Sequence, residues 1–233
     1  MVNNMFQLGE INIPREEVLR YLGYKSSQKI DDNINNLITE CIEETKNIIN
    51  PKFVYAEYTK TLVDNGVLID GTNLILEGND IKEHLKSAKK VVLMAVTLGN
   101  FIEQKTRLYE RINLTKALIL DSCATTAVEE ICDKIEEKVK EEALKENLGI
   151  TFRYSPGYGD LPLDVQKNFV NALRADKTIG LTVSESNLLM PRKSVTAIIG
   201  LIPKDMEVKK KGCEVCKNYE NCSFRREGKS CGS

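Results

Sequence analysis

The sequence predicts an α+β domain in which a mainly antiparallel sheet packs against long helices. Two apolar runs are separated by Asn65-Gly66, a dipeptide that is typical of a tight β-hairpin turn. Residues 115–146 carry apolar side chains at helical spacing over an unusually long stretch. The strands and helices do not alternate regularly, as they would in a parallel sheet built from βαβ units.

The other expected elements follow from the same periodicities. Asp31 or Asp32 can cap a helix over 31–49, and Asn79 can cap a short helix over 80–88. Residues 163–175 form a further helical pattern. Strands are predicted over 53–63, 74–78, 90–99, 150–154, 179–184 and 194–202, of which 90–99 is apolar almost throughout and is therefore expected to be buried.

Composition places the chain among soluble globular proteins. Of its 233 residues 42% are hydrophobic and 29% charged, and the net charge of −1 gives no electrostatic reason to expect nucleic acid or an anionic membrane as partner. No apolar run approaches the roughly 18 residues of a membrane span. The first residues, MVNNMFQLGEINIP, lack the basic start and apolar stretch of a signal peptide. We therefore expect a cytoplasmic protein.

The seven cysteines and the one histidine divide into scattered and clustered residues. Cys41, Cys123 and Cys132 lie in helical stretches and are expected to be small core side chains, while His84 is expected on the surface of a helix. Four cysteines crowd the C-terminal tail, which divides the chain into a domain over 1–205 and a cysteine-rich tail over 206–233. The four are Cys213, Cys216, Cys222 and Cys231.

The spacing of the tail cysteines is C-x2-C-x5-C-x8-C. In a reducing compartment such a cluster suggests a metal more than disulfides, and four thiolates can hold zinc or an iron–sulfur cluster. The spacing matches neither a zinc ribbon nor the common ferredoxin run. The alternative is a tail of reduced cysteines that bind nothing.

The most unusual stretch is RYSPGYGDLP, residues 153–162. Arg153 presents a planar fork of donors that suits a carboxylate. Gly157 permits the close approach of a ligand, and Tyr158 supplies a flat face with a hydroxyl. Together these three residues could bind a small zwitterionic ligand. The alternative is a rigid surface loop in which Arg153 forms an ordinary salt bridge.

RYSPGY resembles the R-x-x-x-G-Y signature of the reactivation domain of cobalamin-dependent methionine synthase, which binds S-adenosylmethionine. AVEEICDKIEEKV (127–139) is similar to the long helix that precedes this signature in the family. The likeness covers about residues 110–200 and implies the family's activation-domain-like fold. Downstream, the segments that look like the family's L-T-x-S and P-x-x-S-V stretch are Leu181-Thr182 with Ser184, and Met190-Pro191 with Ser194-Val195.

The resemblance implies a role for each matching residue. Arg153 would bind the ligand's carboxylate, Ser155 would contribute backbone contacts, Gly157 would admit the backbone close to the ligand, and Tyr158 would contact it. Glu129 would hold the amino group or a neighbouring polar atom. Ser122, Thr125 and Thr126 precede Glu129 on the same side of the helix, where they could form a small polar patch. The alternative is a solvated helix face.

Two departures from the family shape the expected function. The region AIIGLIPKD (197–205) has no aromatic residue where the family has two adjacent tyrosines, and the chain has no D-x-H-x-x-G cobalamin-binding signature. The resemblance therefore implies a freestanding module, with cobalamin on a partner chain. That partner would be a cobalamin-binding methionine synthase chain or another corrinoid protein, and a flavodoxin- or ferredoxin-type protein would donate the electron.

Three functions follow from these observations. The first is an S-adenosylmethionine-binding subunit of a methyltransferase that supports reductive methylation of cob(II)alamin in methionine biosynthesis or a related corrinoid reaction. The second is a metal- or iron–sulfur-binding electron-transfer accessory that kept the fold but lost S-adenosylmethionine. The third is a scaffold that binds a corrinoid protein without chemistry of its own.

Overall fold

The protein is described here by a computed structural model, which covers residues 2–3, 6–24 and 28–206. The predicted metal ligands Cys213, Cys216, Cys222 and Cys231 lie outside the described residues, so the expectation for the tail stays a prediction. The helices are α1 (Arg15–Tyr21), α2 (Asp32–Ile48), α3 (Asn79–Leu85), α4 (Asn100–Ile112), α5 (Leu114–Lys145), the 3₁₀ turn η1 (Leu163–Val165), α6 (Gln166–Leu173) and α7 (Ala175–Thr178).

The strands pair antiparallel throughout the described part of the chain, as the sequence predicts. A seven-stranded sheet has the order β4-β3-β2-β5-β9-β6, with β1 also paired to β2, and β7 and β8 form a separate ribbon. The strands are β1 (Val2–Asn3), β2 (Lys52–Val63), β3 (Gly66–Ile69), β4 (Ile75–Glu77), β5 (Lys90–Thr97), β6 (Leu148–Ile150), β7 (Thr182–Val183), β8 (Leu189–Met190) and β9 (Ser194–Pro203).

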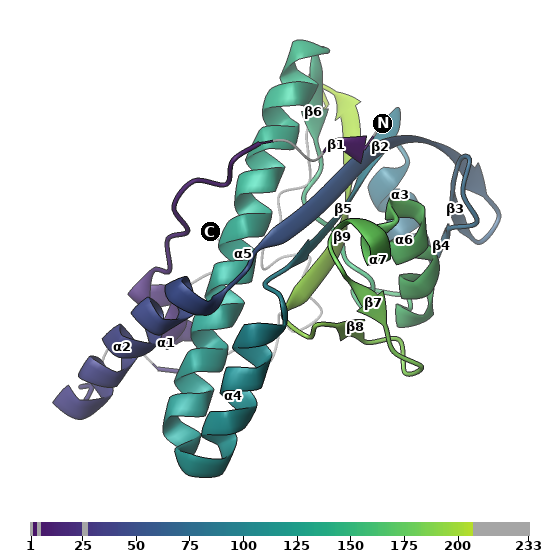
Figure 1. The fold of residues 1–233 in the computed structure, drawn as a ribbon. Coiled ribbons are helices and arrows are strands. Elements are labelled where there is room, and N and C mark those ends of the chain that lie inside the picture. Colours follow the sequence, from purple (N-terminus) through teal and green to yellow (C-terminus); the bar gives the residue numbers. More distant parts are fainter. Residues whose placement is uncertain (1, 4–5, 25–27, 207–233) are drawn as a thin grey trace.

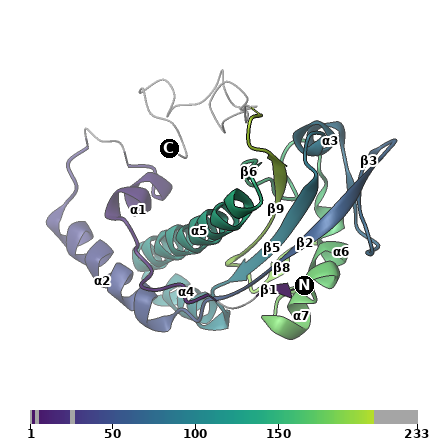
Figure 2. The same ribbon diagram turned by 90° about the horizontal axis from the view of Figure 1, so that it is seen from above.

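Helices cover both faces of this sheet. Figure 2 shows α5 lying along one face with α1 and α2 beyond it, and α3, α6 and α7 on the opposite face. The central strand β5 therefore sends alternate side chains into two cores: Val92 and Met94 pack toward α5, and Val91 and Leu93 pack toward α6. Burial on both faces explains why β5 reads as a continuous apolar run rather than an alternating one.

The predicted helix caps and hairpin need small corrections. Asp31 caps α2, since its side chain accepts a hydrogen bond from the backbone of Asn33. The β2–β3 hairpin exists, but Val63 pairs with Gly66, so the two turn residues are Asp64-Asn65 rather than Asn65-Gly66. Asn79 is the first residue of α3 and not its cap; that cap comes from a distant loop.

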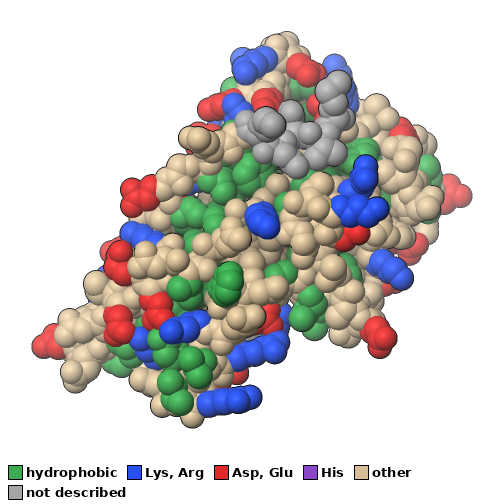
Figure 3. All heavy atoms as spheres, viewed as in Figure 1, with side chains coloured by type: hydrophobic (Ala, Val, Ile, Leu, Met, Phe, Trp, Pro, Cys, Tyr) green, Lys and Arg blue, Asp and Glu red, His purple; other side chains and the backbone are tan. Residues whose placement is uncertain are grey.

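Helix α5 is the longest element and runs across the sheet, with α4 packed antiparallel along its first half (Figure 1). Helix α4, which the sequence analysis did not predict, buries only Ile102. Exposed apolar side chains therefore lie along α4 and at the start of α5, and Figure 3 shows apolar surface at the lower end of the view. They are Phe101, Leu108, Ile112, Leu114 and Leu118.

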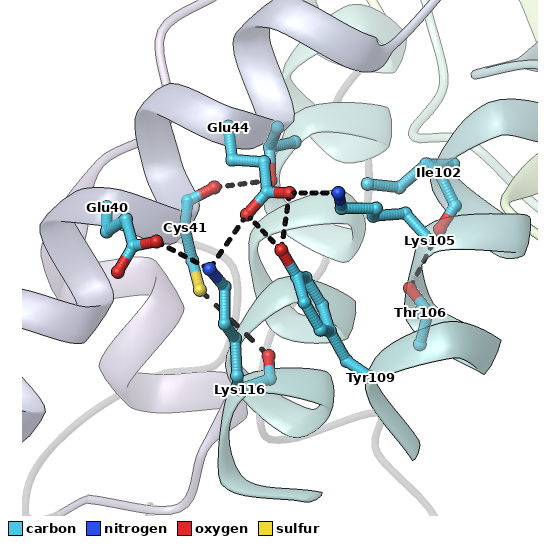
Figure 4. A network of polar contacts seen from close by, with 9 residues as sticks. Glu40, Cys41, Glu44, Ile102, Lys105, Thr106, Tyr109 and Lys116 are labelled. Carbon is cyan, nitrogen blue, oxygen red and sulfur yellow. Dashed lines mark hydrogen bonds and ion pairs between the residues drawn. The ribbon is translucent and has the colours of Figure 1, made fainter. Parts of the chain in front are cut away.

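A half-buried carboxylate joins α2, α4 and α5 (Figure 4). Glu44 of α2 accepts hydrogen bonds from the Tyr109 hydroxyl, and it forms ion pairs at 3.2 Å with both Lys105 and Lys116. The ammonium group of Lys116 also pairs with Glu40 at 2.5 Å. The side chains of Glu44 and Lys116 are only 17% and 12% exposed, so each charge depends on its partners for solvation.

The prediction for the three isolated cysteines is confirmed, and the prediction for the histidine is corrected. Cys41, Cys123 and Cys132 are buried core residues, as predicted. His84 is not a surface residue: it is half-buried, its ring lies against Phe152 and Tyr154, and its Nε2 is 3.0 Å from the carbonyl oxygen of Phe152. Among the described residues, no helix is both long and apolar enough to cross a membrane.

Candidate ligand-binding site

The chain that leaves α5 returns along β9 and forms the edge of the sheet there. Only Leu148–Ile150 forms the strand β6, but Thr151 and Tyr154 continue to hydrogen-bond to β9 at Gly200 and Ile198. Because successive side chains of an extended segment point to opposite faces, Tyr154 enters the core beside α6 and Arg153 points toward α5. The expected strand over 150–154 is thus present as an interrupted edge strand.

Three carboxylates of α5 surround the Arg153 guanidinium. Its Nη2 lies 3.2 Å from Glu129 Oε2 and 2.7 Å from Asp133 Oδ1, and its Nη1 lies 3.2 Å from Glu136 Oε2. The Arg153 side chain is 13% exposed, whereas Asp133 is 66% exposed. The structure therefore brings together two residues predicted to share a site, Arg153 and Glu129, and adds two that were not predicted.

The added residues had a detectable pattern in the sequence. Glu129, Asp133 and Glu136 stand at i, i+4 and i+7 of a predicted helix, a spacing that places three side chains on one face. The polar patch expected on this face comprised only residues that precede Glu129, not the two acidic residues that follow it. Three like charges on one helix face predict a cationic partner from elsewhere in the chain, and Arg153 is that partner.

The electrostatics of this cluster are those of a cation held by an excess of anions. Burial acts to lower the pKa of Arg153, but Cys132, Asp133 and Glu136 act in the opposite direction and the net effect raises the pKa. Arg153 therefore stays charged among the three carboxylates that it contacts. Within the described residues Arg153 Nη1 is buried and has no hydrogen bond of good geometry, although Glu136 lies within ion-pair distance.

The polar patch expected before Glu129 is not an open surface. Ser122 and Thr126 are buried, and their hydroxyls donate hydrogen bonds to the carbonyls of Leu118 and Ser122 within α5. Thr125 is half-buried and accepts a hydrogen bond from Lys193, which also forms an ion pair with Asp121. Small polar side chains that are covered by other elements can form their hydrogen bonds to backbone carbonyls one turn earlier in the same helix.

The remaining predicted residues form a tight turn beside Arg153 in the chain. The backbone N–H of Tyr158 donates to the carbonyl of Ser155 at 3.0 Å, and that of Gly157 donates to Leu161. Gly157 has a φ of +92°, which favours glycine, and a Cβ there would lie 3.1 Å from Leu163. The ring of Tyr158 is 59% exposed, and its contact is with the ring of Tyr154.

Tyr21, an aromatic residue that was not predicted to belong to the site, lies on α1, which packs against α5. Tyr21 ends α1, is 38% exposed, and carries the guanidinium of Arg20 over its ring at 4.3 Å. Burial is the largest cause of its raised pKa, and the Glu129 carboxylate raises that pKa further. Helix α1 thus lines the same side of α5 as Glu129.

The part of the chain that the structure describes contains no metal centre, and its surface hollows lie away from the Arg153 cluster. No group of three or more histidine, cysteine, aspartate or glutamate side chains in the described ranges is arranged to hold a metal ion. Two surface hollows lie elsewhere, one between α2 and α4 beside Phe101 and one beside Tyr55 and Glu142. We therefore take the Arg153 cluster, where two of the residues singled out in the sequence meet, as the candidate site.

Comparison with known proteins shows that this chain has a known fold. No protein-family model matches the chain, and no curated protein matches its sequence. A solved structure described as the MetH reactivation domain bound to AdoHcy is similar to it with a TM-score of 0.63 and 14% sequence identity. The similarity covers 99% of this chain and 86% of that chain. The expected activation-domain-like fold is thus confirmed.

Proposed function

We propose that this protein binds S-adenosylmethionine and serves as a reactivation subunit for a cobalamin-dependent methionine synthase or a related corrinoid methyltransferase. The observation that carries the proposal is the meeting of Arg153 and Glu129 at 3.2 Å on a shared fold. These are two of the residues that the family resemblance assigns to the ligand, and they come from elements 24 residues apart. The solved structure of similar fold is described as bound to AdoHcy.

In the proposed reaction, an electron from a donor protein and the methyl group of S-adenosylmethionine together convert cob(II)alamin on a partner chain to methylcobalamin. This chain would contribute position rather than acid–base chemistry. Arg153 would pair with the ligand's carboxylate, and Glu129 with its amino group. Gly157 would let the backbone approach, Ser155 would offer backbone contacts, and Tyr158, already 59% exposed, would cover the ligand.

Binding requires a rearrangement of the cluster. The Arg153 fork faces Asp133 and Glu136, so an incoming carboxylate must displace at least one of them. Asp133 is the better candidate because its side chain is 66% exposed and can turn into water at little cost. Tyr21 is well placed to supply an aromatic contact from α1, since residues 197–205 lack the aromatic pair of the family.

The test is calorimetric titration of the anaerobically purified protein with S-adenosylmethionine. We expect saturable binding by the wild type and none by Arg153→Ala, with Arg111→Ala, an exposed arginine of α4, as the matched control. Arg153→Ala leaves three carboxylates without their cation, so its thermal unfolding must be measured beside the titration. Arg153→Lys keeps the charge but loses the planar fork, and we expect it to bind weakly while remaining folded.

The electron-transfer accessory remains the second candidate, and one observation favours it. Arg153 is engaged by side chains of its own chain, as an arginine with a purely structural role would be. The candidate rests otherwise on Cys213, Cys216, Cys222 and Cys231. Stoichiometric iron with a visible absorption band, together with no binding of S-adenosylmethionine, would favour it over the first proposal.

A further inference from the structure

We propose that the exposed face of helix α4 is a docking site for a partner protein whose own contact surface is acidic around an apolar centre. Helix α4 buries only Ile102, yet Phe101, Leu108 and Ile112 are 63%, 49% and 67% exposed. Single exposed apolar residues are ordinary on a protein surface, whereas a contiguous set of them marks an interaction site. The inference does not depend on what Arg153 binds.

Phe101, Leu108 and Ile112 form one apolar row, which we call the α4 stripe. They stand at i, i+7 and i+11 of the helix, a spacing that places them on one face. Leu114 and Leu118 at the start of α5 are also exposed and follow the stripe closely in the chain. Beside the stripe, the surface is hollowed between α2 and α4. The hollow is lined by Asn47, Ile48, Phe101, Gln104, Lys105 and Leu108.

Basic side chains border the α4 stripe on both sides. Lys105 stands four residues after Phe101, and Arg111 stands three residues after Leu108, so they flank the stripe on opposite sides. Arg111 is exposed, and the side chain of Lys105 is 38% exposed. Figure 3 shows basic side chains beside the apolar surface at the lower end of its view.

The carboxylates that pair with the basic residues of α4 are more covered than the cations. Glu44, which pairs with Lys105, is only 17% exposed. Arg107 lies further round the helix on the side of Arg111 and is 62% exposed, whereas its partner Glu103 is 14% exposed. A protein that approaches the α4 stripe therefore meets the cations before their counter-charges.

The other acidic residues of this region leave the border of the stripe basic. Glu110 comes two residues after Leu108, which turns it about 200° around the helix to the opposite side. Glu40 and Glu43 of α2 are each paired with a lysine. The α4 stripe therefore combines an apolar centre with a basic border.

This pattern decides between three possible occupants of the surface. Two copies of this chain that met through the α4 stripe about a two-fold axis would bring cations against cations. A lipid-binding cluster usually has about four to eight cations, and α4 has fewer at the stripe on a chain of net charge −1. An acidic protein surface with an apolar centre complements both the stripe and its border.

The first part of the experiment uses the full-length protein in the cells that make it. The photo-reactive variant Leu108→p-benzoylphenylalanine is cross-linked in those cells, and the product is identified by mass spectrometry. Leu62 is the matched control position, because it is 42% exposed and lies near the far end of β2. We expect a cross-link from Leu108, and none from Leu62, to a protein with an acidic surface.

The second part titrates that protein, once purified, with this chain and its variants. We expect Leu108→Ser and Arg111→Glu each to lower the affinity about tenfold, as for residues central to an interface. Leu62→Ser should leave the affinity unchanged. Added salt should weaken binding by the wild type, and by Arg111→Glu less, because that variant has already lost one attractive charge. Thermal unfolding shows that the variants are folded.

Four outcomes would overturn the proposal. A cross-link to a second copy of this chain, with a dimer in sedimentation analysis, would assign the surface to self-association. Binding to vesicles of phosphatidylcholine and phosphatidylserine that Leu108→Ser abolishes would assign it to a membrane. A partner whose affinity is insensitive to salt and to Arg111→Glu would not be the acidic protein proposed. The absence of any cross-link from Leu108 would mean that the surface has no partner in the cell.

Discussion

The carboxylate of Asp160 caps helix α3, which lies 81 residues earlier in the chain. One oxygen accepts a hydrogen bond from the backbone N–H of Asn79 at 2.7 Å, and both oxygens lie within 3.3 Å of the backbone nitrogen of Asp80. Gly78, at the cap position of α3, has no side chain that could do this. The residues that follow Tyr158 are therefore held against the first residues of α3, on the side of the sheet that α3 and α6 cover.

We expect Asp160→Ala to lower the free energy of unfolding by about 1 kcal/mol, the usual cost of losing a side-chain cap. Chemical denaturation of the wild type and the variant measures this difference. Glu185→Ala removes an exposed carboxylate from another loop and should leave the stability unchanged. If Asp160→Ala is as stable as the wild type, the cap is not what holds the loop. The variant should also weaken ligand binding, because Tyr158 lies two residues before the cap.

Gly159 makes a second prediction about the same loop. Its φ is +55°, and a Cβ built there would lie 2.0 Å from the hydroxyl of Tyr154 and 2.5 Å from Asp80. Gly180 has a similar φ of +71° but open space around its Cβ position. Both alanine variants suffer the strain of a left-handed backbone, about 1 kcal/mol. Only Gly159→Ala must also displace Tyr154, so we expect its melting temperature to fall clearly further. Equal melting temperatures would contradict the close packing.

The fold could be predicted largely because its periodicities are strong. Helix α5 packs on one face of the sheet, so its apolar side chains form a single stripe. Strand β5 is covered by helices on both faces, so its sequence is apolar almost throughout. Helix α4 was not predicted because its apolar residues do not form one buried stripe. It buries only Ile102 and exposes Phe101 and Leu108, so its pattern does not point to one buried face.

Two of the four residues of the Arg153 cluster could be predicted from the sequence, but the way in which the four pair could not. The family resemblance selected Arg153 and Glu129, and the structure places them in contact. Periodicity within α5 contains the acidic face that Asp133 and Glu136 complete, but it does not say which cation meets it. That pairing depends on the path of the chain along β9, a contact between segments far apart in sequence. The same limit hid the trans cap supplied by Asp160.

The polar network of Figure 4 predicts a large effect for one carboxylate and a small one for its neighbour. Glu44→Ala would leave Lys116, 12% exposed, without a buried counter-charge and would take away the acceptor of the Tyr109 hydroxyl. We expect a loss of about 1–2 kcal/mol, between the cost of breaking an exposed pair and that of breaking a fully buried one. Glu43→Ala removes an exposed pair with Lys46 and should cost less than about 0.5 kcal/mol. Urea denaturation compares the two variants, and equal losses of stability would mean that the contacts of Glu44 with Lys105, Tyr109 and Lys116 do not stabilise the fold.

The single histidine, His84, is expected to make the free energy of unfolding depend on pH near neutrality. Burial lowers the pKa of His84 below its ordinary value of 6.5, and the hydrogen bond to the Phe152 carbonyl offsets part of that effect. The unfolded chain takes up a proton near pH 6.5, whereas the folded chain resists protonation until the pH is lower. The unfolded state therefore binds more protons in that window, and the free energy of unfolding falls as the pH drops through it.

We expect the imidazole proton resonances of His84, the only histidine in the sequence, to titrate with a pKa below 6.5 in the folded protein. The pH dependence of unfolding from about pH 7 down to about pH 5.5 should be reduced in His84→Gln, which keeps a hydrogen-bond donor but cannot take up a proton in this range. A pKa at or above 6.5 would mean that the imidazole is as well solvated as in a peptide. The packing of His84 against Phe152 and Tyr154 would then not describe the protein in solution.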